Sequence, residues 1–241
     1  MVRIPKYIKT DALLQLRDVT TLLKGLLNES LPEEVFNDLS LKIVNLEAIN
    51  LTDIAAQKSN KPQINIGQTI GDFVTQFCLH AEPNTVWRLM KQLVQYAPII
   101  ETSTRPNGLK LAHNQTLIGQ VLRSAALIGL CYVATQIEFE LANVAIQTRA
   151  DIAELIDFEL MDLENENVKT LLIEVRDNSI DYISNIIKGL SSIADITTEV
   201  QTPSIILAYD IYGDANKAVD LVKINGLKNS LLCPTKIEAA I

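Results

Sequence analysis

TPSIILAYDIYGDANKAVDLVKINGLKNSLLCP, residues 202–234, predicts two short helices around a tight turn, followed by an extended exit. Pro203 suits the first turn of a helix, where the missing N–H of proline leaves no hydrogen bond unmade. The first helix is expected to stop at Gly213-Asp214. Its periodicity predicts an apolar stripe made of Ile205, Ile206, Ala208, Tyr209 and Tyr212.

A second helix is expected from about Ala215 to Ile224, with Ala218, Leu221 and Val222 buried. Asn225-Gly226 predicts its end, because these two residue types best tolerate the left-handed conformation of a C-terminal cap. Pro234 lies in the extended exit. Nothing in these residues is suited to catalysis, so the pattern favours a docking module.

The run LAYDIYGDANKAVDLVKING, with Pro234 downstream, resembles the C-terminal end of the DNA circularisation (or circulation) proteins, which are tail and baseplate proteins of Mu-like phages. In that family a Leu-Ala-Tyr-x-x-Tyr-Gly-Asp-Ala helix and turn lead to a helix that ends in Asn-Gly or Asn-x-Ile. The same residues resemble a degenerate LysM module. This resemblance implies docking or structural roles for Tyr209, Tyr212, Gly213, Asp214, Asn225, Gly226 and Pro234.

The resemblance extends upstream to about Gly119, through QVLRSAALIGL and AIQTRADIAELID, which are similar to two helices of the family. Two departures stand out. The family usually carries a β-rich N-terminal domain, whereas residues 1–110 here have a helical pattern. A His-Pro pair usually follows the family's asparagine, whereas the corresponding region here is Asn229-Ser230-Leu231-Leu232.

The composition favours packed helices. Hydrophobic residues make up 48% of the chain but aromatic residues only 5%, so aliphatic side chains must fill the interior. We therefore expect a mainly-α fold, a multi-helix bundle followed by a small LysM-like helix-turn-helix module with short extended segments. The expected divisions are an N-terminal helical region at 1–110, a long-helix hairpin or bundle at 111–195 and a C-terminal docking module at 196–241.

Periodicity and capping signals predict the helices of the first two divisions. Thr10 is the expected N-cap of a first helix, and Ser30 to Glu33 forms a capping-box pattern for a second. Further helices are expected at 69–79, 85–96, from 117 to a polar break at 138–140, at 141–156 and at 168–187. Expected non-helical segments are an arm or short strand at 1–9, a loop at 57–68 and an extended linker at 193–201. Residues 101–114, with a turn at Pro106-Asn107-Gly108, are expected to form either a hairpin loop or the main boundary in the chain.

Charge, cysteines and hydropathy exclude several classes of protein. The net charge is −8 and no Lys/Arg cluster occurs, so direct nucleic-acid binding is not expected. Cys78, Cys131 and Cys233 lie far apart, a spacing typical of reduced and mostly buried thiols. The N-terminus lacks the apolar region of a signal peptide. The most apolar window, Ser124 to Ala134, is shorter than the roughly twenty residues that span a bilayer, so no membrane span is expected.

The sequence has few residues in patterns suited to catalysis or metal binding. No serine has a histidine partner in a recognisable motif, and the carboxylate pairs lie in acidic connections. His80 and His113 have no ligand spacing around them. We therefore expect no enzyme activity, no cofactor and no metal.

The sequence favours a structural component of a contractile phage tail, at the baseplate hub or the tube–baseplate junction. Such a protein acts by docking to hub, tube or wedge subunits and by self-assembly into a symmetric ring. It is assembled in the host cytoplasm and located in the virion. The alternatives are a peptidoglycan-binding LysM-like module that positions a lysin, and an α-helical scaffold protein unrelated to phage.

Overall fold

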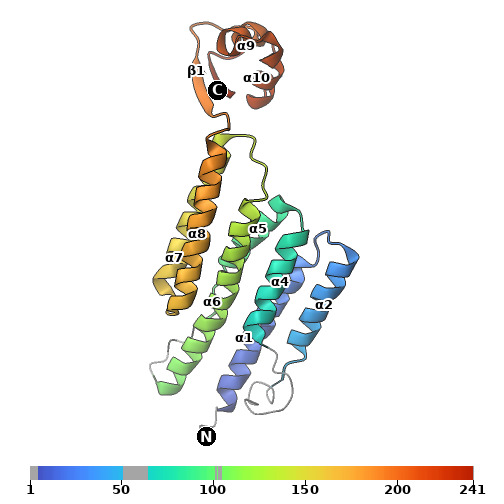
Figure 1. Ribbon diagram of the computed structural model, residues 1–241, viewed down its shortest axis with the longest axis vertical. Coiled ribbons are helices and arrows are strands. Elements are labelled where there is room, and N and C mark those ends of the chain that lie inside the picture. The colour runs from blue at the N-terminus through green and yellow to red at the C-terminus, as the bar shows by residue number, and fades with distance from the viewer. Residues whose placement is uncertain (1–4, 51–64, 101, 103–104, 241) are drawn as a thin grey trace. The chain divides into compact units, whose positions relative to one another are not determined.

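The structure is a computed structural model, and it describes residues 5–50, 65–100, 102 and 105–240. Helices dominate, which confirms the mainly-α fold with short extended segments (Figure 1). The helices are α1 (Lys6–Leu26), α2 (Glu33–Glu47), α4 (Ile66–His80), α5 (Pro83–Val94), α6 (Pro106–Ala134), α7 (Ala142–Asp162), α8 (Glu166–Ile187), α9 (Ser204–Tyr212) and α10 (Ala218–Ile224). A 3-10 turn, η1 (Ala215–Lys217), precedes α10, and the strands are β1 (Ile193–Thr197) and β2 (Lys236–Ala240).

The chain divides into two compact units. The first comprises residues 1–137 and 151–180, and the second comprises residues 138–150 and 181–241. Helices α7 and α8 therefore belong in part to each unit. The expected polar break between two helical stretches is confirmed, because α6 ends at Ala134 and α7 begins at Ala142.

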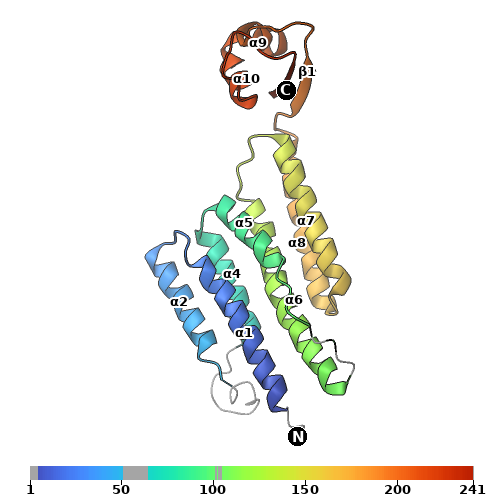
Figure 2. The same ribbon diagram turned by 180° about the vertical axis from the view of Figure 1, so that it is seen from behind.

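Helix α6 is the centre of the first unit, where it contacts α1, α4 and α5 (Figure 1; Figure 2 shows the same helices from behind). A glycine permits the close approach to α4. A Cβ built on Gly129 would lie only 2.7 Å from Cys78 Sγ and 3.3 Å from Val74 Cγ1. Gly129 therefore lets the two helix backbones approach more closely than alanine would allow.

The helical spacing of their apolar residues predicts the inward faces of α4 and α5, and the structure confirms both faces. Each repeats at the helical period that buries one side of a helix. All their predicted core residues are buried: Ile70, Phe73, Val74 and Phe77 on α4, and Val86, Leu89, Met90, Leu93 and Val94 on α5. Trp87 is partly buried, as its position at the edge of this face predicts.

A buried ion pair joins α6 to α7 within the first unit. Arg123 Nε and Nη2 donate to the two carboxylate oxygens of Glu159 at 2.6 and 3.0 Å, and Arg123 Nη1 donates to the Tyr96 carbonyl oxygen at 3.0 Å. The Glu159 side chain is only 4% exposed. Pairing on both oxygens offsets the cost of taking the two charges out of water.

The predicted N-caps of the first two helices are wrong. Helix α1 already begins at Lys6, so Thr10 lies inside it, and its hydroxyl donates to the Lys6 carbonyl oxygen at 3.1 Å. The arm or strand expected at 1–9 is therefore helical from Lys6, and its first four residues lie outside the described residues. Helix α2 has Pro32 at its N-cap, so the Ser30–Glu33 capping box does not form. In both cases a proline immediately before the helix sets its start.

The predicted turn at Pro106-Asn107-Gly108 is also wrong. These residues form the first turn of α6, and Gly108 is buried in it. Proline is compatible with that position because the first N–H groups of a helix have no intrahelical partner. The loop expected at 57–68 lies mostly outside the described residues. Its last part begins α4 at Ile66, where Asn65 Oδ1 accepts the Gln68 N–H at 3.2 Å.

Residues 193–240 form a strand–helix–helix–strand arrangement, named here the βααβ module. Its strands pair antiparallel, with Ile193 opposite Ala240 and Thr197 opposite Lys236. An isolated bridge between Thr202 and Cys233 continues this pairing. The linker expected at 193–201 is therefore a strand over its first five residues, and its partner β2 lies just beyond the extended exit expected before Pro234. Local sequence patterns alone do not show which distant segments of a chain pair with each other.

Candidate docking module at the C-terminal end

The βααβ module has a hydrophobic core of its own. This core consists of Leu207, Ala208, Leu221, Cys233, Ile237 and Ala239, with Ile196, Ile211, Tyr212, Ala218 and Leu227 packed against it. Members come from both strands and both helices, so the module has the organisation of a small independent folding unit.

The predicted apolar stripe on α9 is mostly wrong. Ala208 is buried and Tyr212 partly buried, but Ile205, Ile206 and Tyr209 are 56%, 49% and 64% exposed. The buried side instead carries Ser204, Leu207, Ala208, Ile211 and Tyr212, which recur at the helical spacing. Because nearly every position of this helix is apolar, its periodicity cannot select one face. We call Ile205, Ile206 and Tyr209 the outer α9 face.

Gly213 and Asp214 form the predicted turn. Gly213 ends α9 with φ +69°, and its N–H donates to the Tyr209 carbonyl oxygen at 2.8 Å. This left-handed conformation is readily adopted by glycine, which has no Cβ. Asp214 then caps η1, because its Oδ1 accepts the Asn216 N–H at 2.9 Å.

Asn225 and Gly226 end α10 as the sequence predicts. Gly226 has φ +58°. The Gly226 N–H donates to the Lys223 carbonyl oxygen and the Leu227 N–H to the Val222 carbonyl oxygen, at 3.2 and 3.0 Å. These two bonds are the Schellman arrangement, which satisfies the last carbonyl groups of a helix.

Tyr212 and Asn225 meet at the outer edge of β2, the edge that faces away from β1. The Tyr212 hydroxyl accepts the Ala240 N–H at 3.2 Å, while Asn225 bonds to both the N–H and the carbonyl oxygen of Glu238. Lys217 Nζ lies 4.9 Å from the centre of the Tyr212 ring. Burial raises the pKa of the Tyr212 phenol, and the Asp220 carboxylate acts in the same direction. The neutral phenol thus serves as the acceptor for Ala240.

The remaining predicted site residues lie elsewhere. Tyr209 is exposed, although its place in the predicted apolar stripe favours packing between the two helices. Pro234 is exposed and lies between Cys233 and Thr235, both of which bond to the segment that follows β1. Sequence reasoning missed Glu238 and Ala240 as partners of Asn225 and Tyr212. The available signal for strand β2 was the alternation of polar and apolar residues in Lys236–Ala240. In the structure Ile237 and Ala239 are buried, whereas Lys236 and Glu238 are exposed.

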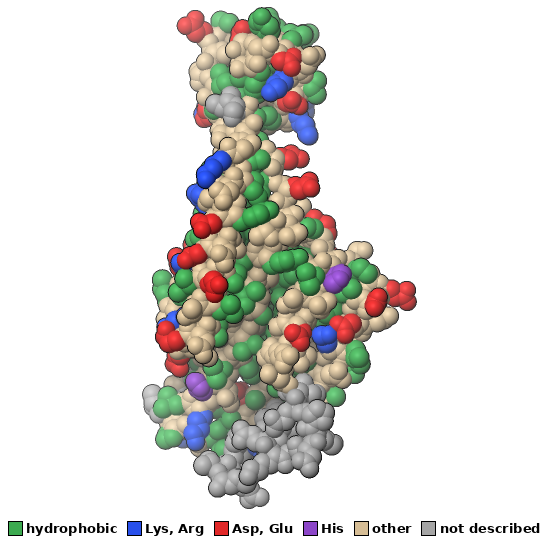
Figure 3. Space-filling model, viewed as in Figure 1, with side chains coloured by type: hydrophobic (Ala, Val, Ile, Leu, Met, Phe, Trp, Pro, Cys, Tyr) green, Lys and Arg blue, Asp and Glu red, His purple; other side chains and the backbone are tan. Residues whose placement is uncertain are grey.

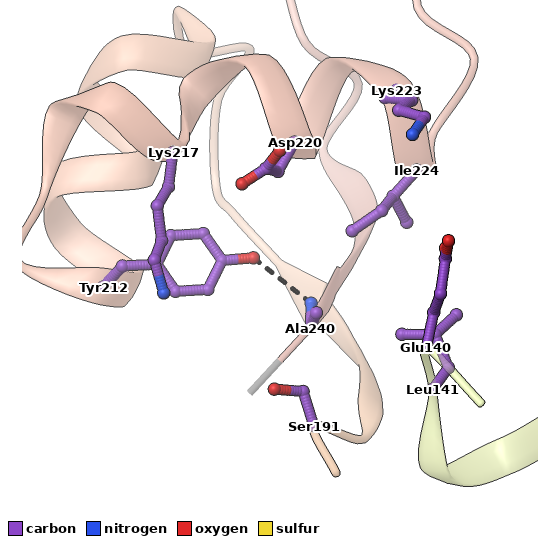
Figure 4. A pocket seen from close by; sticks show the side chains of 9 residues that line it. All are labelled: Glu140, Leu141, Ser191, Tyr212, Lys217, Asp220, Lys223, Ile224 and Ala240. Atoms are coloured by element: carbon purple, nitrogen blue, oxygen red, sulfur yellow. Dashed lines mark hydrogen bonds between the residues drawn. The ribbon is translucent and has the colours of Figure 1, made fainter. Parts of the chain in front are cut away.

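An open cleft of about 410 Å³ lies within the second unit, against α10 (Figure 4). Lys217, Asp220 and Lys223 line it from η1 and α10, and Glu140, Leu141 and Ser191 line it from other segments of this unit. In Figure 4 the Tyr212 ring forms one wall, with its hydroxyl directed at Ala240. Acidic and basic side chains are mixed, and the lining contains no histidine or cysteine to pair with the Ser191 hydroxyl.

Elsewhere in the described residues the reactive groups are dispersed. The described residues contain no cluster of three or more His, Cys, Asp or Glu side chains that could hold a metal ion. Both histidines are exposed. The three cysteines are free and buried, as expected, and burial raises the pKa of Cys78 to about 12 and of Cys131 to about 11. Such thiols carry very little of the nucleophilic thiolate near neutral pH.

Helix α6 is the one helix of the described chain that is long and apolar enough to cross a membrane. Its best window has a mean hydropathy of 1.6, and 61% of that window is buried inside the protein. Length and composition alone do not separate a membrane span from the core helix of a soluble protein. The expected absence of a membrane span stays a prediction.

The surface of the βααβ module carries hydrophobic side chains, several of which reach the face drawn in Figure 3. Besides the outer α9 face, the large hydrophobic side chains exposed on this module are Val200, Val219, Leu231 and Leu232.

No model of a known protein family matches the sequence, and a search of curated proteins likewise gives no match.

Proposed function

We propose that the protein is a structural component of a contractile phage tail, at the baseplate hub or at the tube–baseplate junction. It docks to hub, tube or wedge subunits and assembles with copies of itself in a symmetric ring. It acts in the virion after assembly in the host cytoplasm. The resemblance of the Tyr-Gly-Asp and Asn-Gly segments to the DNA circularisation proteins of Mu-like phages supports this proposal.

One observation carries the docking role: the outer α9 face is apolar and exposed on a module that has its own core. Ile205, Ile206 and Tyr209 lie on the side of α9 opposite the buried Leu207 and Ala208. Large apolar side chains grouped on a helix surface are typical of protein interaction sites. Tyrosine is also enriched among the residues that contribute most to binding energy.

Two measurements test the proposal. Mass spectrometry of purified virions should detect the protein in the tail fraction, and its absence there would overturn the tail assignment. The double variant Ile205→Ser/Tyr209→Ser should fold normally but enter tails at a much lower level. Val219→Ser is the matched control, because Val219 is 73% exposed on α10 and lies off the outer α9 face. Normal incorporation of the double variant would show that α9 is not the docking surface.

Peptidoglycan binding is the second candidate, because the two helices, the Tyr-Gly turn and Asn225 at the end of α10 are the features in which residues 202–234 resemble a LysM module. Sedimentation of the purified chain with insoluble peptidoglycan tests it. Retention in the pellet would support a sugar-binding role, whereas a chain that stays in the supernatant would eliminate it.

A further inference from the structure

The two edges of the β1–β2 sheet differ in how they are closed. On β2, side chains take the place of a neighbouring strand. Asn225 Nδ2 donates to the Glu238 carbonyl oxygen at 2.7 Å, and Asn225 Oδ1 accepts the Glu238 N–H at 2.8 Å. The Tyr212 hydroxyl accepts the Ala240 N–H. Both outward backbone groups of Glu238 and the N–H of Ala240 are thus satisfied by side chains of the module.

On β1 the corresponding groups face away from the module. The Thr198 N–H donates to the Thr235 carbonyl oxygen at 2.7 Å, which fixes the register of the ladder. Because hydrogen-bonding residues alternate along an antiparallel strand, the backbone groups of Ile193, Asp195 and Thr197 point outward. Among the described residues these outward groups have no hydrogen-bond partner, and the side chains of Asp195 and Thr197 are exposed. Figure 1 shows β1 along the margin of the module, with α9 and α10 to one side.

An uncovered edge of this kind is a template for another strand. The charges along β1 restrict which strand fits. Asp195 and Glu199 are exposed, and no lysine or arginine lies between residues 193 and 200. Asp195 already attracts one cation across the sheet, since Lys236 Nζ lies 3.0 Å from its carboxylate. A second copy paired about the strand centre would oppose Asp195 to itself, and like charges directly opposite each other destabilise a sheet.

We propose that the outer edge of β1 accepts an extended strand from a different protein chain, with a lysine or arginine of that strand beside Asp195. The incoming backbone bonds to Ile193, Asp195 and Thr197 and converts the two-stranded sheet into a three-stranded one. This inference rests on the proposed docking role of the module and identifies a second contact besides the outer α9 face. Asn225 and Tyr212 occupy the middle and the end of the β2 edge, so β1 is the edge that offers three consecutive outward residues.

The test uses the full chain and two short capped peptides of alternating valine and threonine, one with a central lysine and one with a central glutamate. The readout is the hydrogen-exchange rate of individual backbone amides by NMR. At peptide concentrations up to about 1 mM, the lysine peptide should slow exchange at Ile193, Asp195 and Thr197. It should bind about fivefold more tightly than the glutamate peptide, because opposite charges stabilise a cross-strand pair and like charges oppose it. Added salt should reduce this preference.

Two variants distinguish the contribution of the β1 backbone edge to peptide binding from that of the Asp195 charge. Thr197→Pro removes one outward N–H without touching the ladder to β2, so the module should stay folded and binding should be lost. Asp195→Asn keeps the edge and should bind both peptides equally. Unchanged exchange rates with the lysine peptide, or full binding by a folded Thr197→Pro variant, would overturn the proposal.

Concentration-dependent protection of the same amides without any peptide would identify a second copy as the occupant and would equally overturn it. The result is independent of the virion measurement. Absence from virions would remove the tail assignment and leave edge pairing intact, whereas failure of the peptide test would leave the tail assignment standing.

Discussion

The side-chain amide of Asn225 pairs with the backbone of Glu238 through both of its polar atoms, at 2.7 Å from Nδ2 to the carbonyl oxygen and 2.8 Å from Oδ1 to the amide nitrogen. In this geometry the amide side chain imitates the backbone of a neighbouring strand. The same side chain donates to the Leu221 carbonyl oxygen at 2.9 Å. Asn225 therefore links the end of α10 to the middle of β2.

Replacement of Asn225 by alanine should destabilise the βααβ module by about 1–3 kcal/mol, because three hydrogen bonds to backbone groups are lost and each contributes about 0.5–1.5 kcal/mol. Amide exchange at Glu238 should accelerate together with the loss of stability. Asn185→Ala is the matched control, because Asn185 is exposed and its Oδ1 accepts a hydrogen bond from the Nζ of the exposed Lys188. Its effect on the free energy of unfolding should stay within about 0.5 kcal/mol. Equal effects of the two substitutions would contradict the structural role of Asn225.

Gly213→Ala should destabilise the protein by about 1 kcal/mol. The space is open, since no atom lies within 4 Å of the added Cβ, so the whole cost comes from holding alanine at φ +69°. Gly71→Ala makes the same chemical change inside α4, where the added Cβ also meets nothing within 4 Å and φ is not positive. There alanine should stabilise by about 0.5–1 kcal/mol through its higher helix propensity. Urea denaturation of both variants should thus give shifts of opposite sign, and a stabilised Gly213→Ala variant would refute the left-handed turn.

Gly129→Ala should destabilise the first unit, because its Cβ would lie 2.7 Å from Cys78 Sγ. Overpacking typically costs about 1–3 kcal/mol, which exceeds the roughly 1 kcal/mol that alanine gains over glycine in a helix. In a Cys78→Ala background the obstructing sulfur is gone, so the same substitution should become much less costly. A double-mutant cycle on the free energy of unfolding measures this coupling. Additive effects would mean that α4 and α6 do not approach as closely as the structure shows.

The buried thiols should react slowly while the protein is folded. Burial raises the pKa of Cys78 to about 12 and of Cys131 to about 11, against an ordinary value of 9.0. Since the thiolate is the reactive species, iodoacetamide at pH 8 should label both cysteines far more slowly in the native protein than in urea. Peptide mass spectrometry locates the label. Rapid labelling of Cys78 in the folded chain would contradict its burial against α6.

The same pKa shifts predict how stability depends on alkaline pH. Unfolded thiols release their protons near pH 9, whereas the folded Cys78 and Cys131 thiols hold theirs until about pH 12 and 11. Between these values the unfolded state has fewer bound protons, so stability should fall as the pH rises above about 9. Cys78→Ala/Cys131→Ala should flatten this part of the pH profile, measured by urea midpoints. A profile unchanged by the double substitution would show that these thiols do not contribute to it.

Local signals in the sequence were sufficient for much of the fold. The inward faces of α4 and α5 were predictable because apolar residues recur there at the helical period, with polar residues between them. The turn at Gly213 and the end of α10 at Asn225-Gly226 were predictable because only a few residue types suit left-handed backbone. Local signals gave wrong helix starts where a proline begins the helix. Pro32 and Pro106 mark the starts of α2 and α6, whereas Ser30 had suggested an earlier N-cap and Gly108 a turn.

By itself, the sequence determined where the helices of the βααβ module end and which residues stop them, because capping and glycine conformation depend only on neighbours along the chain. Tertiary structure decided which side of α9 is buried, because that helix is apolar nearly all round and only its packing on α10 and the module core distinguishes its faces. It also decided that Tyr212 and Asn225 bond to the edge of β2, since Ala240 and Glu238 are distant from them along the chain and are brought to them only by the fold.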